Sequence, residues 1–247
     1  MNNNKNENNN KESCETVRIN KYIASQGICS RRQADKLIED AKVKINGKTA
    51  VLGDVVGPND EVKVNGKQLG QRDIPSVYIA FNKPKGIITT SAKDVHNNII
   101  DYLDYPERIF AVGRLDKDSE GLIILTNDGD IVNKMMKSRS NKEKEYLVEV
   151  DKDITSEFQE NMENGVRILN QKTKPAKFKY INKRQFRLTI TQGLNRQIRR
   201  MCEALGYEVI NLKRLRIMNI DLGNLKTGTW RYITHNELEQ LKSLLDR

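Results

Sequence analysis

The chain has 247 residues, enough for two modest domains that each bury a core. Its net charge of +10 predicts attraction to a polyanion, and its apolar runs are strand-sized, far below the roughly 18 residues that a membrane-spanning helix needs. We therefore expect a protein that does not enter a membrane. The three cysteines and two histidines lack the spacing of a zinc site, and neither histidine lies in a catalytic motif. Three widely spaced cysteines favour a reduced, cytoplasmic protein.

The N-terminal region begins with a polar tail. Residues 1–15 include seven asparagines within the first ten positions and almost no apolar side chains, a composition that predicts disorder. A helical pattern follows, with Ile19 and Ile23 four residues apart. Ser30 and Gln33 then form the signature of a capping box at the start of a second helix, whose apolar side is expected to run to Ala41.

The second helix and the residues after it form a small basic module. Two short alternating strands, 43–48 and 62–67, each run into an Asn-Gly turn. The exposed cations predicted for this surface are Arg31, Arg32, Lys36 and Lys44. They could serve solubility alone, but four cations on one small surface can neutralise several phosphates, so we expect them to contact RNA. Residues 16–66 are therefore predicted as an RNA-binding domain.

A domain boundary is predicted at residues 67–76, where periodicity is lost and Gly and Pro accumulate. The second domain, 77–247, opens with an apolar strand and a basic turn that contains Lys83. Further strands are predicted at 110–112, 122–125, 144–150, 178–180, 186–190 and 230–233. Because strands outnumber helices and do not alternate regularly with them, we predict an α+β fold with a mostly antiparallel mixed sheet flanked by helices and loops.

The most informative stretch is GRLDKDSEGLIILTNDG, residues 113–129. It places a crowded polar turn directly before a buried strand, and side chains anchored at the rim of a rigid element often carry chemistry. Turns favour Asp, Ser and Gly in any case, so an ordinary solvated loop remains an alternative at this point.

A second informative stretch is the amphipathic helix predicted from Leu194 to Leu205 and ended by Gly206. Its apolar side consists of Leu194, Ile198, Met201 and Leu205, and its polar side of Arg196, Arg199, Arg200 and Glu203. A basic helix face of this kind can keep a nearby aspartate ionised.

Residues of this kind are compatible with three classes of enzyme that act on RNA. A zinc deaminase would need His and Cys ligands that are missing. A magnesium-dependent nuclease could use Asp116, Asp118 and Glu120, although adjacent acids on one turn do not by themselves form a two-metal site. The third is a metal-free mechanism with one carboxylate as nucleophile, and Tyr146 is then the candidate for stacking on an unpaired base.

The motifs resemble known families. VRINKYIASQGICSRRQADKLIEDAKVKINGKTA is similar to the S4-like αL RNA-binding module, which binds structured RNA. FNKPKG, GRLDKDSEGLIILTNDGD, KEYLV and GLNRQIRRMCEALGY resemble the motifs of the RsuA/RluB/RluE/RluF group of pseudouridine synthases, and are most similar to its RluF branch. The resemblance extends from residue 17 to about residue 245.

The resemblance implies roles for individual residues. Asp116 would be the nucleophile that attacks a flipped-out uridine, and Arg114 would hold the base out or fill the gap it leaves. Tyr146 would stack on the uracil and assist removal of the ring proton, Arg199 would pair with Asp116, and Ile198 would shape the pocket. Further RNA contacts are expected from Asn195, Arg196, Gln197, Arg200 and Lys83. Members of the group need no metal or organic cofactor.

The resemblance also implies a substrate. We expect a uridine in a stem-loop of 23S ribosomal RNA, with transfer RNA as a second candidate, and a monomeric enzyme. The alternatives are another ribosomal RNA site, as in the RluB, RluE or RsuA branches, and a catalytically silent RNA-binding factor in ribosome assembly.

Overall fold

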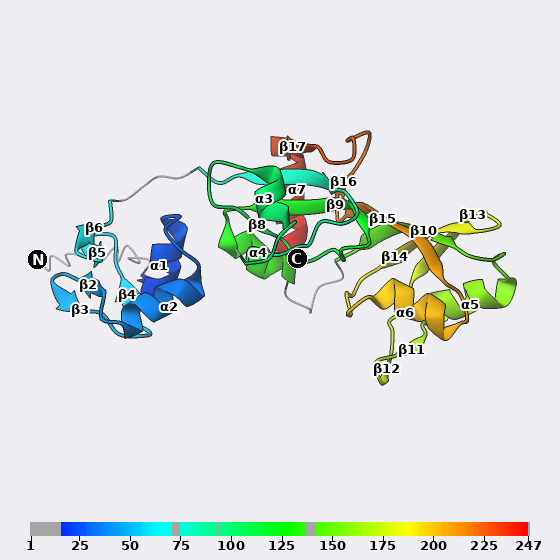
Figure 1. Ribbon diagram of the computed structural model, residues 1–247, viewed down its shortest axis with the longest axis horizontal. Helices are drawn as coiled ribbons and strands as arrows, with labels where there is room; N and C mark the ends of the chain where they lie inside the picture. The colour runs from blue at the N-terminus through cyan, green and yellow to red at the C-terminus, as the bar shows by residue number, and fades with distance from the viewer. Residues whose placement is uncertain (1–15, 71–74, 93, 137–141, 247) are drawn as a thin grey trace, which may run out of the picture. The chain divides into compact units, whose positions relative to one another are not determined.

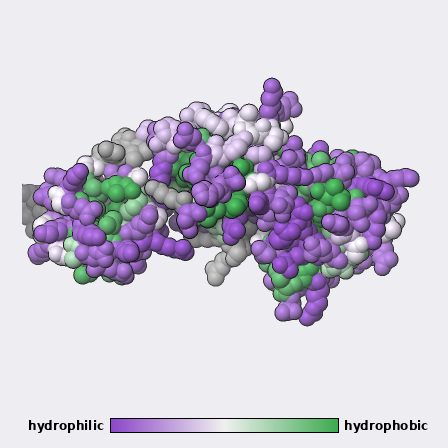
Figure 2. Space-filling model, viewed as in Figure 1, coloured by the Kyte–Doolittle hydropathy of each residue, from purple (hydrophilic) through white to green (hydrophobic). Residues whose placement is uncertain are grey.

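The computed structural model describes residues 16–70, 75–92, 94–136 and 142–246, and the predicted tail 1–15 lies outside them. The chain divides into two compact units, Met1–Pro75 and Ser76–Arg247 (Figure 1). Hydrophilic side chains cover most of the face seen in Figure 2, in keeping with a mean hydropathy of -0.69. Within the described ranges, no helix has the length and apolar character that crossing a membrane requires.

The N-terminal unit packs two helices against short strands. Its elements are β1 (Val17–Arg18), α1 (Ile19–Ser25), α2 (Arg31–Glu39), β2 (Val43–Ile45), β3 (Lys48–Thr49), β4 (Val55–Val56), β5 (Val62–Val64) and β6 (Lys67–Gln68). Strands β3-β2-β5-β6 form one sheet, and β1 pairs with β4. The capping box is present, because the Gln33 amide donates to the Ser30 hydroxyl and the Ser30 amide donates to Oε1 of Gln33. The core side chains include Ile19, Ile23, Ala34 and Ile38.

Two predicted boundaries in this unit were wrong. Helix α2 ends at Glu39, and Ala41 is exposed with a positive φ of 56°, so it continues neither the helix nor its apolar side. The predicted linker 67–76 began too early, because Lys67–Gln68 form β6 and pair with β5. An Asn-Gly turn at Asn65 reverses the chain into this last strand, which is the usual role of that dipeptide.

The second unit contains one large sheet with helices on both sides. Its elements are β7 (Tyr78–Lys83), α3 (Ile99–Leu103), β8 (Phe110–Ala111), β9 (Glu120–Thr126), α4 (Gly129–Met136), β10 (Lys144–Val150), α5 (Ser156–Asn164), β11 (Arg167–Ile168), β12 (Gln171–Lys172), β13 (Lys177–Asn182), β14 (Gln185–Ile190), α6 (Gln197–Ala204), β15 (Val209–Ile217), β16 (Ile220–Asp221), β17 (Trp230–Tyr232) and α7 (His235–Leu245). The strand order is β13-β14-β10-β15-β9-β7-β17, with β8 beside β9 and β16 beside β15.

The sheet is mixed and mostly antiparallel, which confirms the predicted α+β fold. Only the contact between β9 and β15 is parallel among the strand pairs of this sheet within the described residues. This pairing brings Gly121 next to Arg214 and Glu120 next to Lys213. Strand β15 was not predicted from the sequence, although it lies at the centre of the sheet.

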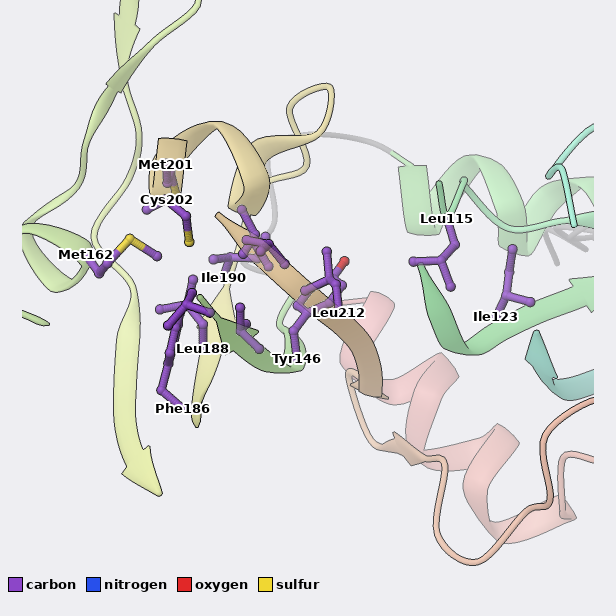
Figure 3. Close-up of a cluster of buried hydrophobic side chains, with 14 of the residues drawn as sticks. Leu115, Ile123, Tyr146, Met162, Phe186, Leu188, Ile190, Met201, Cys202 and Leu212 are labelled. Atoms are coloured by element: carbon purple, nitrogen blue, oxygen red, sulfur yellow. The ribbon is translucent and has the colours of Figure 1, made fainter. Parts of the chain in front are cut away.

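Strand β9 is buried on both faces. Ile123 and Leu125 pack into one core with Tyr146, Leu188 and helices α5 and α6, part of which is drawn in Figure 3. Leu122 and Ile124 pack into a second core beneath α4 and α7. Because both faces of β9 are packed, the polar turn that precedes it is attached to a rigid base.

Candidate active site

The turn between β8 and β9 holds Asp116 in a defined position. The hydroxyl of Thr89 donates to the Leu115 carbonyl at 2.7 Å and accepts from the Leu115 amide at 3.3 Å. The Ser119 amide donates to the Asp116 carbonyl at 3.1 Å. Leu115 is buried in the main core, so the residue before Asp116 is fixed by both packing and hydrogen bonds. The Asp116 side chain is half-buried at the mouth of a cavity.

This cavity joins the turn to strands β10, β14 and β15 and to the start of α6. Its volume is about 80 Å³ and it opens to solvent. It is lined by Arg114, Leu115, Asp116, Ser119, Tyr146, Ile190, Leu194, Arg196, Gln197, Ile198 and Leu212. Four of these side chains are labelled in Figure 3, where Tyr146 on β10 and Leu212 on β15 lie side by side. A carboxylate, an aromatic ring and apolar walls therefore meet in one pocket, the arrangement expected of a site for a flat polar ring.

The predicted site residues are largely brought together here. The pocket contains Asp116, Tyr146, Arg114, Ile198 and the helix-start residues Arg196 and Gln197. Gln197 also shapes the local backbone, because its side-chain carbonyl accepts from the Leu194 amide at 3.0 Å. The Tyr146 side chain is only 8% exposed and reaches the pocket from the core side.

Arg199 does not lie on an exposed basic face, as the helix pattern had predicted. It is 8% exposed, and its guanidinium donates to the carbonyls of Val209 at 3.0 Å and Asp118 at 3.1 Å. It thus bonds to the backbone of the turn that carries Asp116, and not to the Asp116 carboxylate. Its Nε is buried without a hydrogen-bond partner among the described residues. The helix pattern mispredicted this side of α6 because strand β15 and the turn that carries Asp116 cover it.

Lys83 was predicted to lie in a basic turn and to contact RNA, but the structure does not place it at the surface. It is the last residue of β7, it is fully buried, and its Nζ donates to the carbonyls of Pro84 and Ile87, each at 2.9 Å. Burial, assisted by the charge of Arg214, lowers the pKa of Lys83 to about 8. Its role in the structure is to hold the turn after β7 closed.

The remaining cations at the start of α6 lie at the rim. Arg196 approaches the Asp118 carboxylate at 3.7 Å, an exposed pair of little energetic weight. Arg200 donates to the main-chain and side-chain oxygens of Asn195, at 3.1 and 3.3 Å, so these two residues are bound to each other beside the pocket. Among the described residues no group of three or more His, Cys, Asp or Glu side chains is placed to hold a metal ion.

The cations predicted for the N-terminal unit are all exposed. Arg31, Arg32 and Lys36 lie on α2, and Lys44 lies on β2. Their apolar neighbours Ala34 and Ile38 point into the small core, so the helix separates a packed side from a basic side as predicted.

Sequence reasoning missed Arg214. This side chain, on β15 directly opposite Tyr146, is 2% exposed and bonds to the turn that carries Asp116. Alternation of buried residues along β15 would have been the signal for it, but two bulges interrupt the register with β10.

Comparison with known proteins shows which families this chain is similar to. The model of the RNA pseudouridylate synthase family matches residues 77–204, and that of the S4 domain matches residues 17–62. The chain is 52% identical over 232 residues to the dual-specificity RNA pseudouridine synthase RluF of Escherichia coli (strain K12), covering 94% of this chain and 80% of that protein. It is 40% identical over 238 residues to the ribosomal large subunit pseudouridine synthase B of Bacillus subtilis (strain 168), covering 93% and 97%.

A crystal structure of a pseudouridylate synthase has the same fold. It superposes with a TM-score of 0.67 at 32% identity, covering 91% of this chain and 99% of that one. These similarities confirm the family resemblance drawn from the motifs.

Proposed function

Because the chain belongs to the RNA pseudouridylate synthase family and carries an S4 domain, we propose that it isomerises a specific uridine of 23S ribosomal RNA to pseudouridine, with Asp116 as nucleophile. The observation that carries this proposal is the pocket in which the Asp116 carboxylate meets the ring of Tyr146 between apolar walls. A pocket of this kind can hold one nucleobase that has left its stack.

Each residue of the pocket would have a separate role in the reaction. The Asp116 carboxylate attacks C1′ of the ribose, the carbon that carries the base, and a new C–O bond forms. The bond from C1′ to N1 of the uracil breaks, and its electron pair stays on the base. The base turns, its C5 bonds to the sugar carbon, and the carboxylate leaves. Tyr146 stacks on the base and assists removal of the C5 proton. Arg114, exposed at the edge of the pocket, holds the uridine out of the RNA helix.

Arg199 would act on the nucleophile. It already bonds to the Asp118 carbonyl in the same turn, and its buried Nε has no hydrogen-bond partner among the described residues. A small movement of the turn on RNA binding would let the guanidinium pair with the Asp116 carboxylate and keep it ionised in a pocket from which water is excluded.

The substrate is proposed from charge and from similarity. The exposed cations of the N-terminal unit suit structured RNA, which proteins recognise largely by shape and backbone contacts. The name of the E. coli relative describes a dual-specificity enzyme, so we propose a 23S stem-loop as the main substrate and a transfer RNA anticodon uridine as the second. A monomer acting in the cytoplasm is proposed, and Asn195, Arg196, Gln197 and Arg200 are placed along the RNA path.

Two alternatives have specific support. The B. subtilis relative bears the name of another large-subunit synthase, so a different uridine of the same RNA is possible as the target. A silent RNA-binding factor would use the same surface, but it would not need a carboxylate and a tyrosine in one pocket.

The test compares two aspartates of the same turn. Asp116→Asn should abolish pseudouridine formation and leave RNA affinity within a few-fold, because only the nucleophile is lost. Asp118→Asn is the matched control, since its exposed carboxylate pairs weakly with Arg196, and it should retain turnover within a few-fold. Release of tritium from C5-labelled uridine in ribosomal and transfer RNA fragments measures the reaction. Normal release by Asp116→Asn would exclude the mechanism, and no release by the unmodified protein from any fragment would favour the silent factor.

A further inference from the structure

Arg214 occupies an unusual position for a cation. It lies on the central strand β15, where its neighbours are Tyr146 on β10 and Gly121 on β9, and only 2% of its surface is exposed. Burying a charge costs free energy unless the charge is paired, and no carboxylate pairs with Arg214 among the described residues. The side chain is therefore not explained by an ion pair, and an apolar residue would fill the same space at lower cost.

The guanidinium joins three parts of the site. Its Nε donates to the Leu122 carbonyl at 2.6 Å, which fixes the group against strand β9. Its Nη1 lies 3.3 Å from the Arg114 carbonyl in the catalytic turn and 3.5 Å from the Tyr146 hydroxyl. One nitrogen thus bridges the turn that presents Asp116 and the ring that would stack on the base. The rigid planar fork of arginine suits such a bridge, whereas the flexible ammonium of lysine does not.

Two further observations describe the surroundings of this charge. The second terminal nitrogen, Nη2, is buried without a hydrogen-bond partner among the described residues. The nearby lysines Lys83 and Lys144 are also buried or half-buried, and the charge of Arg214 contributes, after burial itself, to lowering the pKa of each. A positive charge held in this way behind Tyr146 would be preorganised to stabilise negative charge in the pocket.

We propose that Arg214 is a positioning residue of the pocket, which sets the Tyr146 hydroxyl against the turn of Arg114 and Asp116. The proposal rests on the function proposed above and adds to it a residue that lines no part of the cavity. In the reaction, Arg214 would hold the tyrosine in place while the base turns, because the backbone carbonyls of Leu122 and Arg114 prevent the guanidinium from following the ring.

The first experiment is a double-mutant cycle on the single-turnover rate at saturating RNA. Arg214→Gln should lower the rate at least 100-fold with RNA affinity changed less than threefold. In a Tyr146→Phe background the same change should lower the rate less than tenfold, because Arg214 acts in part by positioning the Tyr146 hydroxyl, which this background lacks. Arg216→Gln is the matched control: this neighbour on β15 pairs with Glu143 and Glu145 away from the pocket, and its loss should leave the rate within threefold. Equal fold losses in both backgrounds would overturn the proposal.

A second experiment does not depend on the reaction. Fluorotyrosine is incorporated at the eight tyrosines, and the Tyr146 fluorine resonance is assigned by its loss in Tyr146→Phe. This resonance should shift in Arg214→Lys, which keeps the charge but loses the fork, and stay unchanged in Arg216→Gln. An unshifted resonance in Arg214→Lys would overturn the proposal even if no RNA substrate is turned over. A shift without any turnover by the unmodified protein would instead leave the positioning intact and remove the proposed function.

Discussion

Replacing Gly121 with alanine should separate the two strands that meet at the active site. Gly121 has a φ of +106°, and a Cβ at this position would lie 2.3 Å from the carbonyl oxygen and 2.6 Å from the nitrogen of Arg214. Both atoms belong to the backbone of β15 and cannot turn away as a flexible side chain would. Ordinary contact between carbon and oxygen requires about 3.3 Å, so β9 and β15 must part by about 1 Å.

The cost can be worked out from these contacts. Positive φ for a residue with a side chain costs about 1 to 3 kcal/mol. Parting the strands also weakens the pairing of Arg214 with Gly121 and the short bond from Arg214 Nε to the Leu122 carbonyl, at about 1 kcal/mol for each hydrogen bond. The expected loss is therefore about 3 to 5 kcal/mol, a large share of the roughly 5 to 15 kcal/mol that stabilises a typical domain.

Two other glycines serve as controls that distinguish the cost of backbone strain from the cost of the steric clash with β15. Gly86 has a φ of +88° but open space around it, so Gly86→Ala should cost only the strain, about 1 to 3 kcal/mol. Gly129 begins α4, lacks a positive φ and also faces open space, so Gly129→Ala should be neutral or stabilising. Urea unfolding followed by circular dichroism gives the three free energies of unfolding. A Gly121→Ala loss within 1 kcal/mol of the Gly86→Ala loss would refute the argument from strand contact.

Two further predictions concern charge. Burial lowers the pKa of Lys83 from its ordinary value of 10.5 to about 8, so between these pH values the unfolded chain binds this proton more tightly than the folded protein does. The free energy of unfolding should therefore rise with pH across this range, by up to about 3 kcal/mol relative to the Lys83→Met protein. Urea unfolding of both proteins at pH 7.5 and pH 10 checks this, and a constant difference would contradict it. Replacing both Arg31 and Arg32 with Glu should weaken ribosomal RNA binding at least tenfold and flatten its salt dependence by about one to two counterions, while Lys242→Glu on α7 should change neither. Filter binding at several salt concentrations measures this, and an unchanged salt slope would remove these cations from the RNA surface.

The features that could be predicted from the sequence were local ones. Strand β9 followed from an unbroken apolar run between two turns, and α2 followed from a serine and a glutamine three residues apart. The hypothesis that Asp116 and Tyr146 belong to one site came from motif resemblance, and the structure places both side chains in one pocket. These features depend on residues close together in the chain, so the sequence pattern carries them.

The features that could not be predicted depend on contacts between distant segments. Strand β15 could not be predicted because bulges at Ile210 and Leu215 interrupt the alternation of buried and exposed residues. Its buried residues therefore do not recur at every second position. Arg199 was assigned to an exposed face because a helix pattern shows two sides and cannot show that a loop 80 residues earlier covers the polar one. Lys83 looked like a turn residue because its buried hydrogen bonds go to backbone carbonyls, which leave no trace in the sequence.

The geometry of the site therefore depends on a strand that supplies only one wall of the pocket. Strand β15 runs antiparallel to β10, which carries Tyr146, and parallel to β9, which follows Asp116 in the chain. One residue of β15, Arg214, pairs with Tyr146 on β10 and with Gly121 on β9. Its backbone fixes the spacing to Gly121, and its side chain bonds to the turn before β9 and to the tyrosine on β10. Because the same residue sets both distances, a change in strand spacing should alter the positions of Asp116 and of the Tyr146 ring together. The Gly121→Ala and Arg214→Gln proteins should consequently share one defect, a slower reaction with RNA affinity retained, although only the first begins with the backbone.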